Sequence, residues 1–227
     1  MLRVFIGWDK RQPISYQVLH HSIVSRATAP ISITPLIIDQ LPIKRKGLTD
    51  FTWSRFLVPY LCGFEGVGVF LDADMLCLDD LSAFETFFGQ DAVKVSKNQH
   101  KFEWASFIQF NCAHPHNRIL TPEYVEKANG LHQINWTDQV GSIDPMWNFL
   151  AGYDTPTDQQ PKLVHYTQGL PIYPETDGTP YADLWRAEHR AMNFAEPWQV
   201  LMGNSVHAAP TADGRLVAKL HRDAVAR

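Results

Sequence analysis

Two aspartates separated by one alanine, Asp72 and Asp74, directly follow a continuous apolar run from Val67 to Leu71. Such a run is typical of a strand buried on both faces, and side chains at i and i+2 of a strand point to the same side. Two unpaired carboxylates this close repel each other and are costly to desolvate, and a divalent cation with oxygen ligands removes both costs. The pattern therefore predicts a metal site for an anionic diphosphate, with a solvated acidic turn as the alternative.

A β-α-β pattern at the start of the chain indicates what kind of sheet carries these aspartates. An apolar strand is predicted at residues 2–7, a helix begins near Pro13, and β-branched residues mark a second strand at 31–38. Strands joined in this way lie parallel and are covered by helices. We expect an α/β fold with a mixed, mainly parallel sheet, whose carboxyl ends open into a ligand-binding crevice.

The rest of the chain predicts shorter elements. These are strands at 92–96, 107–112 and 163–167, an amphipathic segment at 51–61, a short helix from Leu81 capped by Asp80, a helix at 122–128 capped by Thr121, and a surface helix at 180–194.

Composition limits the class of protein. The chain has 227 residues, 45% hydrophobic and 19% charged, which is enough for one substantial core. We expect one domain over 1–227, with a core that ends near residue 171 and a helical or irregular extension at 172–227. A net charge of −4, with Lys44–Lys46 as the one cationic cluster, argues against nucleic acid as a partner.

The cysteines and the apolar runs bear on the compartment. Cys62, Cys77 and Cys112 have no CxxC or CxxH spacing and cannot all pair within one chain, which favours buried, reduced thiols. No apolar stretch approaches the roughly 20 residues of a membrane helix, and the apolar N-terminus is too short for a signal peptide. We expect a cytoplasmic protein without a transmembrane segment, and the sequence does not indicate its oligomeric state.

The stretch Phe70–Met75 resembles the "YLDAD" signature of the GT-A glycosyltransferases, in particular glycosyltransferase family 8, which includes glycogenin and bacterial lipopolysaccharide galactosyltransferases. Five other stretches resemble elements of that family in the same order: Trp53–Pro59 its "YxRLxLP" helix, Phe110–Ala113 its "FNSG" strand, Asp138-Gln139 its "DQD" element, Trp147-Asn148 its "WN" element, and Leu163–Thr167 its "IxHYxG" strand. The resemblance implies a GT-A fold, with Rossmann-like nucleotide binding.

The resemblance also implies a ligand set for the metal. Asp72 and Asp74 would bind it, with Asp72 also near the ribose, and His165 would be the third protein ligand. A neutral imidazole beside two carboxylates suits Mn²⁺, with Mg²⁺ as the alternative ion. A histidine packed in the core without a ligand is the competing interpretation of His165.

Five residues are implied in nucleotide binding besides the metal: Gly7, Trp8, Asp9, Arg55 and Gly169. The alternatives are an ordinary strand-to-helix turn for the first three and a helix-surface salt bridge for Arg55.

Asn111, Asp138 and Gln139 fall where the family's side chains contact the donor sugar and the reaction centre. A turn asparagine and an N-cap aspartate are the structural alternatives. The implied activity is metal-dependent transfer of a hexose from a nucleoside-diphosphate sugar, in particular a UDP-sugar, to a saccharide or other polar acceptor. The family implies retention of configuration, and a front-side displacement is expected because no carboxylate is an evident nucleophile.

The chain departs from the family after His165. The family closes with His-x-x-Gly-x-x-Lys-Pro-Trp, whereas here the glycine, Gly169, comes one residue late and no lysine follows. This departure leaves a catalytically degenerate nucleotide-sugar-binding protein as an alternative. A sugar nucleotidyltransferase is another, although residues 7–10 are a poor substitute for its glycine-rich basic loop.

Overall fold

A computed structural model describes residues 1–193, 208–210 and 216–218. Residues 1–192 form one compact unit, and residues 193–227 belong to a second. In the second unit, β10 (Ala208–Pro210) and β11 (Leu216–Ala218) form an antiparallel hairpin. The rest of the expected extension beyond residue 193 lies outside the described residues.

The first unit is built on a six-stranded sheet with the order β2-β1-β3-β6-β5-β7. Its strands are β1 (Leu2–Gly7), β2 (Ile31–Leu36), β3 (Val67–Leu71), β5 (Val93–Ser96), β6 (Phe107–Asn111) and β7 (Val140–Ile143). β1 is parallel to β2 and β3, and β5 is parallel to β7, whereas β6 is antiparallel to both of its neighbours. The mixed, mainly parallel sheet expected from the sequence is therefore confirmed, and β7 is an addition to it.

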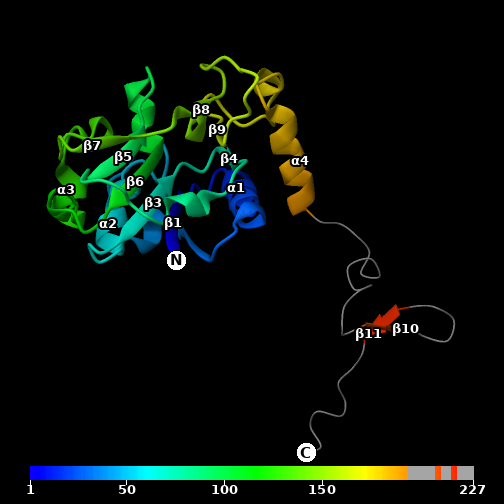
Figure 1. Cartoon of the computed structure of the whole chain (residues 1–227), viewed down its shortest axis with the longest axis horizontal. Helices are drawn as coiled ribbons and strands as arrows, with labels where there is room; N and C mark the ends of the chain where they lie inside the picture. Colours follow the sequence, from blue (N-terminus) through cyan, green and yellow to red (C-terminus); the bar gives the residue numbers. More distant parts are fainter. Residues whose placement is uncertain (194–207, 211–215, 219–227) are drawn as a thin grey trace, which may run out of the picture. The chain divides into compact units, whose positions relative to one another are not determined.

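Helix α1 (Pro13–Arg26) makes the first crossover, with Pro13 in its first turn as expected. It buries Val18, Leu19 and Ile23, which are apolar positions on the side that faces the sheets. Helix α4 (Ala182–Met192) lies beside α1 (Figure 1). Glu188 of α4 joins the two helices through ion pairs with α1. Its Oε1 lies 2.5 Å from His21 Nδ1, and its Oε2 lies 2.9 Å from Arg26 Nη2.

A second, three-stranded sheet in this unit was not foreseen as a sheet. It consists of β4 (Met75–Cys77), β9 (Leu163–His165) and β8 (Phe149–Leu150), in the order β4-β9-β8. Only β9 corresponds to a predicted strand, and it ends two residues earlier than expected. The register pairs Met75 with His165, so the residue after the aspartates lies beside a residue far along the chain.

The short helices follow the predicted caps. Asp80 accepts a hydrogen bond from the Ser82 N–H at the start of a 3₁₀ helix, and Thr121 caps α3 (Pro122–Lys127). The amphipathic segment forms a 3₁₀ helix at Ser54–Leu57 followed by α2 (Val58–Leu61).

The three cysteine thiols are free and buried, as the sequence predicted. Within the described part of the chain, none of the helices combines the length and the apolar character needed to cross a membrane.

Candidate metal and nucleotide site

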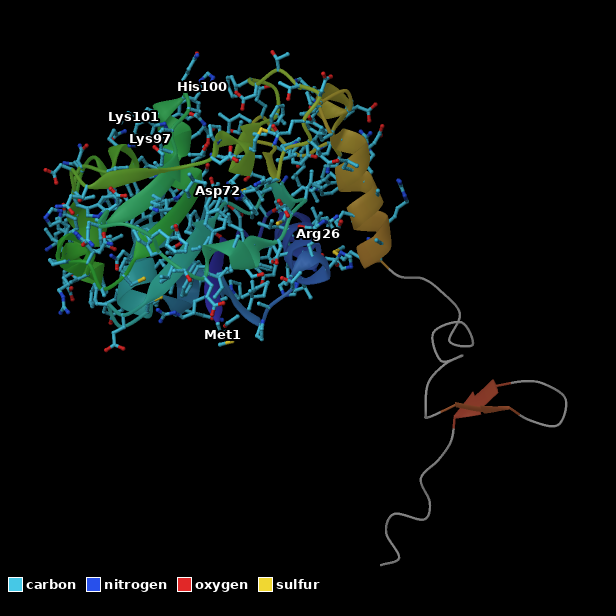
Figure 2. The ribbon with its side chains drawn as sticks, viewed as in Figure 1. Met1, Arg26, Asp72, Lys97, His100 and Lys101 are labelled. Carbon is cyan, nitrogen blue, oxygen red and sulfur yellow. The ribbon has the colours of Figure 1, made fainter. Side chains whose placement is uncertain are left out.

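The aspartates lie in the bend that joins the two sheets. β3 ends at Leu71 and β4 begins at Met75, so Asp72 and Asp74 stand at the carboxyl end of β3 without belonging to a strand. The Asp72 N–H donates to the carbonyl of Ser106 at 2.9 Å, which ties the bend to the residue directly before β6. Figure 2 shows Asp72 in the interior of the unit, where it is 8% exposed.

His165 reaches both aspartates from the end of β9. Its Nε2 is 3.4 Å from Asp74 Oδ1 and 4.0 Å from Asp72 Oδ2. The β4–β9 pairing produces this proximity, and the Tyr166 N–H fixes it by donating to the carbonyl of Asp74 at 2.9 Å. The structure thus brings together the three residues that the sequence selected as metal ligands.

Glu103 is a fourth member of the cluster that sequence reasoning missed. Its Oε2 is 3.7 Å from His165 Nδ1, and its Oε1 accepts a hydrogen bond from the Thr167 hydroxyl. Among the described residues, Asp72, Glu103 and His165 form a buried group whose ligand atoms all lie within 4.8 Å of one another. The signal that could have indicated Glu103 is its position shortly before a predicted strand. In the structure it belongs to a 3₁₀ helix (Lys101–Ser106) directly before β6.

Arg55 is a buried partner of Asp72. Its Nη2 is 3.0 Å from Asp72 Oδ1, and its Nη1 donates to Asp72 Oδ2 at 3.3 Å and to the Ala105 carbonyl at 2.8 Å. The side chain is 8% exposed, so the helix-surface salt bridge weighed as an alternative is a buried ion pair instead.

The pKa values of Asp72 and His165 are both raised, so both side chains keep their protons to higher pH than usual. Burial raises the pKa of Asp72 to about 7, against the opposing effect of Arg55 and with a further rise from Asp74. For His165, burial lowers the pKa, but Asp74, Glu103 and Asp72 outweigh it and raise the value to about 9. The cluster therefore carries more negative charge than Arg55 alone can balance.

The donor set fits a divalent cation. Among the described residues, Asp74 Oδ1 is buried without a hydrogen-bond partner, and His165 Nε2 faces it at 3.4 Å. Carboxylate oxygens with one imidazole nitrogen suit Mn²⁺ or Mg²⁺. A cation held here would neutralise the excess carboxylate charge and complete the coordination of these atoms.

We expect the metal-free protein to lose stability as pH rises. The folded pKa of His165, about 9, exceeds its ordinary value of 6.5, so its stabilising contribution is complete below pH 6.5 and is lost as pH rises through 9. The raised pKa of Asp72 acts in the same direction between pH 3.8 and about 7. Thermal melts in EDTA should show the decline, and His165→Gln should flatten it above pH 7. A wild-type Tm that rises between pH 7 and 9 would contradict the expectation.

A small cavity connects the end of β1 with the aspartates. Its volume is about 260 Å³, and it lies between Asp9 and Arg11 on one side and Ala73 and Asp74 on the other. The Asp9 carboxylate is already paired, because Arg11 Nε donates to it at 2.9 Å and the Asp50 N–H donates at 3.2 Å. The Arg11 hydrogen bond is the main reason that the pKa of Asp9 falls to about 2.

The neighbours of Asp9 have packing roles in the structure. A Cβ at Gly7 would lie 2.4 Å from the Phe51 ring, so glycine lets that ring pack on the end of β1. Trp8 packs edge-on against Tyr16, with 5.2 Å between ring centroids, and does not line the cavity.

A larger cavity of about 600 Å³ also has Arg11 in its wall. It extends along the loop that contains Lys44, Arg45 and Lys46, and Asp39 and Asp50 are its acidic residues. Its volume falls within the usual range of small-molecule sites.

Gly169 lies in the turn after β9. Its φ of +119° is a left-handed conformation that favours glycine, and its N–H donates to the Tyr166 carbonyl at 2.8 Å. The segment that follows brings Tyr173 to the wall of the 260 Å³ cavity, where its hydroxyl accepts a hydrogen bond from Gln12 at 3.0 Å.

The three residues expected at the reaction centre lie at the opposite end of the strands from Asp72. Asn111 pairs with Val67, the first residue of β3, five residues and roughly 17 Å from Asp72. Asp138 and Gln139 precede β7, which runs parallel to β5, and the Ala92 N–H donates to the Gln139 carbonyl at 2.9 Å. The structure therefore does not bring these residues to the metal cluster. The physical reason for Asn111 is that β6 is antiparallel, so its last residue lies at the amino ends of its neighbours.

Comparison with solved structures shows what this fold is similar to. The apo-form glycosyltransferase GlyE of Streptococcus pneumoniae TIGR4 matches with a TM-score of 0.62 and 16% identity over 89% of this chain, which spans 62% of the GlyE chain. The galactosyltransferase LgtC, in complex with donor and acceptor sugar analogues, matches with a TM-score of 0.59 and 12% identity over 88% of this chain and 99% of LgtC. The bifunctional glycosyltransferase WbbM matches with a TM-score of 0.58 and 14% identity over 89% of this chain and 51% of WbbM. The α/β fold of GT-A type is therefore confirmed.

Sequence comparison gives the family. No protein-family model matches the chain. Protein CDI of Arabidopsis thaliana is 34% identical over an alignment of 228 residues, which covers 84% of this chain and 87% of that protein. The chain belongs to the same protein family as Protein CDI.

Proposed function

We propose that this protein is a metal-dependent glycosyltransferase that takes a hexose from a nucleoside-diphosphate sugar. The observation that supports the proposal best is the convergence of Asp72, Asp74 and His165 at the carboxyl end of β3, beside a cavity that leads to the end of β1. Carboxyl ends of parallel strands are where α/β sheets bind nucleotides. The likeness to GT-A glycosyltransferases in fold favours a nucleotide sugar as the ligand.

The proposed site has two parts with different chemistry. Asp72, Asp74 and His165 would hold Mn²⁺ or Mg²⁺, and the ion would offset the negative charge that develops on the departing nucleoside diphosphate. Arg55 holds Asp72 in place through a hydrogen bond from Nη1 and an ion pair with Nη2, and Glu103 faces the other nitrogen of His165. A partner on the far side of a metal-binding histidine fixes the orientation of the ring.

The nucleoside would extend away from the metal past Arg11. The 260 Å³ cavity is lined by Asp74 and Arg11, and Arg11 also lines the 600 Å³ cavity, which would receive the nucleoside. UDP is our choice of nucleotide, with transfer to a saccharide or other polar acceptor and retention of configuration, as the resemblance to glycosyltransferase family 8 implies. The proposed reaction centre does not include Asn111, Asp138 and Gln139, because they lie at the other end of the strands.

A thermal-shift screen of nucleoside diphosphates and their sugars, with Mn²⁺ or with EDTA, tests the proposal. Ligand at 100 times its Kd stabilises the folded state by about 2.7 kcal/mol, which corresponds to a Tm increase of roughly 5–11 °C for a chain of this size. We expect such an increase for UDP or a UDP-sugar only when Mn²⁺ is present. Absence of any metal-dependent shift would refute the proposal, and binding without release of UDP from the sugar would favour the degenerate binding protein.

A further inference from the structure

We propose that Arg11 is the side chain that binds the diphosphate of the donor nucleotide in the 260 Å³ cavity. This inference rests on the proposed function, and it names the residue that supplies positive charge beside the metal. Of the described residues that line this cavity, Arg11 is the one with a positive side chain, and Asp74 of the metal cluster is another member of the same wall.

The position of the guanidinium is well defined. Arg11 Nε donates to Asp9 Oδ1 at 2.9 Å, and Nη2 contacts Asp9 Oδ2 at 2.5 Å and donates to the Leu48 carbonyl at 2.8 Å. The Arg11 backbone N–H also donates to Asp9 Oδ1 at 2.9 Å. Asp9 itself is buried and fixed by the Asp50 N–H, so the guanidinium is held along one edge.

The other edge of the guanidinium is available for a ligand. Nη1 makes no hydrogen bond or ion pair with any residue that the structure describes, and the side chain is 63% exposed. A guanidinium has five N–H donors in a planar fork that matches phosphate oxygens. An arginine held on one edge and open on the other is therefore prepared for a phosphate without losing much side-chain entropy.

The other cations near the site do not line the 260 Å³ cavity. Both terminal nitrogens of Arg55 face Asp72, and Nη1 also donates to the Ala105 carbonyl. Lys10 and Lys44 line the 600 Å³ cavity, not the smaller one next to Asp74. The segment after β9 contributes the hydroxyl of Tyr173 to the smaller cavity and no charge. Arg11 is therefore the cation best placed for a diphosphate whose other side is bound to the metal.

Comparing UDP with uridine separates a phosphate contact from a structural role. Calorimetric titrations with Mn²⁺ present would measure both Kd values for wild type, Arg11→Gln, Arg11→Lys and the control Arg190→Gln, which removes the charge of an exposed arginine on α4. We expect Arg11→Gln to weaken UDP about 10- to 100-fold, in line with loss of charge-assisted hydrogen bonds, while uridine binding changes less than about 2-fold. Arg11→Lys should keep part of the preference for UDP, and Arg190→Gln should behave as wild type.

Each other outcome has a definite meaning. If Arg11→Gln weakens uridine and UDP equally, Arg11 acts only by holding Asp9, and the inference is wrong. Unchanged UDP affinity in Arg11→Gln also contradicts it, and Arg11→Lys, which retains the charge, guards against an unfolded variant. A wild-type protein that binds neither UDP nor any other nucleoside diphosphate would refute the proposed function, and the inference with it.

Discussion

Replacing Asp74 with asparagine is expected to abolish the Mn²⁺-dependent binding of UDP and to lower release of UDP from its sugar by more than about 100-fold. Loss of a residue that only supports a metal ligand already costs about 10- to 100-fold, and loss of a ligand should exceed that. Asp74 is the informative position because its Oδ1 is buried without a hydrogen-bond partner, and its nearest charged group is His165 at 3.4 Å. Mn²⁺ affinity of the nucleotide-free protein, followed by electron paramagnetic resonance, measures the effect without turnover.

The fold should survive this change. Asp74 pairs with no arginine in the part of the chain that the structure describes, and its side chain is 29% exposed, so asparagine leaves neither a cavity nor an unpaired buried cation. Asp158→Asn, at an exposed position in the loop before β9, is the matched control for the loss of one negative charge. If Asp74→Asn binds Mn²⁺ as tightly as wild type does, Asp74 is not a ligand, and the buried group of Asp72, Glu103 and His165 would have to hold the ion alone.

Local pattern was sufficient to predict the strands that carry the candidate metal ligands. The apolar run before Asp72 was correctly predicted as a buried strand, since burial on both faces leaves a continuous apolar sequence, and a short strand was correctly predicted at His165. The distance between the two in the chain was bridged only by resemblance to a family. The pairing of β4 with β9, which produces the contact, involves strands of three residues each that are too short to show a period.

Strand direction explains the residues that were missed or misplaced. The "Phe-Asn-Cys" stretch at the end of β6 resembles a site element of the family. Because β6 runs antiparallel to β3, however, Asn111 lies beside the first residue of β3, at the opposite end of that strand from Asp72. For the same reason, the residues directly before β6 lie beside Asp72 and His165, where the Ser106 carbonyl accepts the Asp72 N–H and Glu103 faces His165. Hydrophobic period identifies a strand but carries no information about its direction, so this reversal could not be derived from sequence.

The second large effect concerns Arg55, for which we expect substitution by methionine to destabilise the protein by about 3–5 kcal/mol. Methionine preserves much of the side chain's volume but leaves the Asp72 carboxylate buried without its counterion and the Ala105 carbonyl without its donor. For a chain of this size, the loss corresponds to a Tm decrease of roughly 6–20 °C. Thermal or urea unfolding of the metal-free protein at pH 8 measures it.

Three further measurements assign that loss to the charge on Asp72. Arg55 lowers the pKa of Asp72, so its removal should raise that pKa further above its value of about 7. The variant should then be destabilised less at pH 5, where Asp72 is protonated, than at pH 8. The double variant Arg55→Met with Asp72→Asn should lose less stability than the sum of the single changes, because the uncompensated charge is absent.

Mn²⁺ should also stabilise Arg55→Met more than wild type, since the ion replaces the missing cation beside Asp72. A loss that is equal at both pH values, additive with Asp72→Asn and indifferent to Mn²⁺ would mean that Arg55 acts through packing on Phe70, 4.9 Å away, and not through its charge.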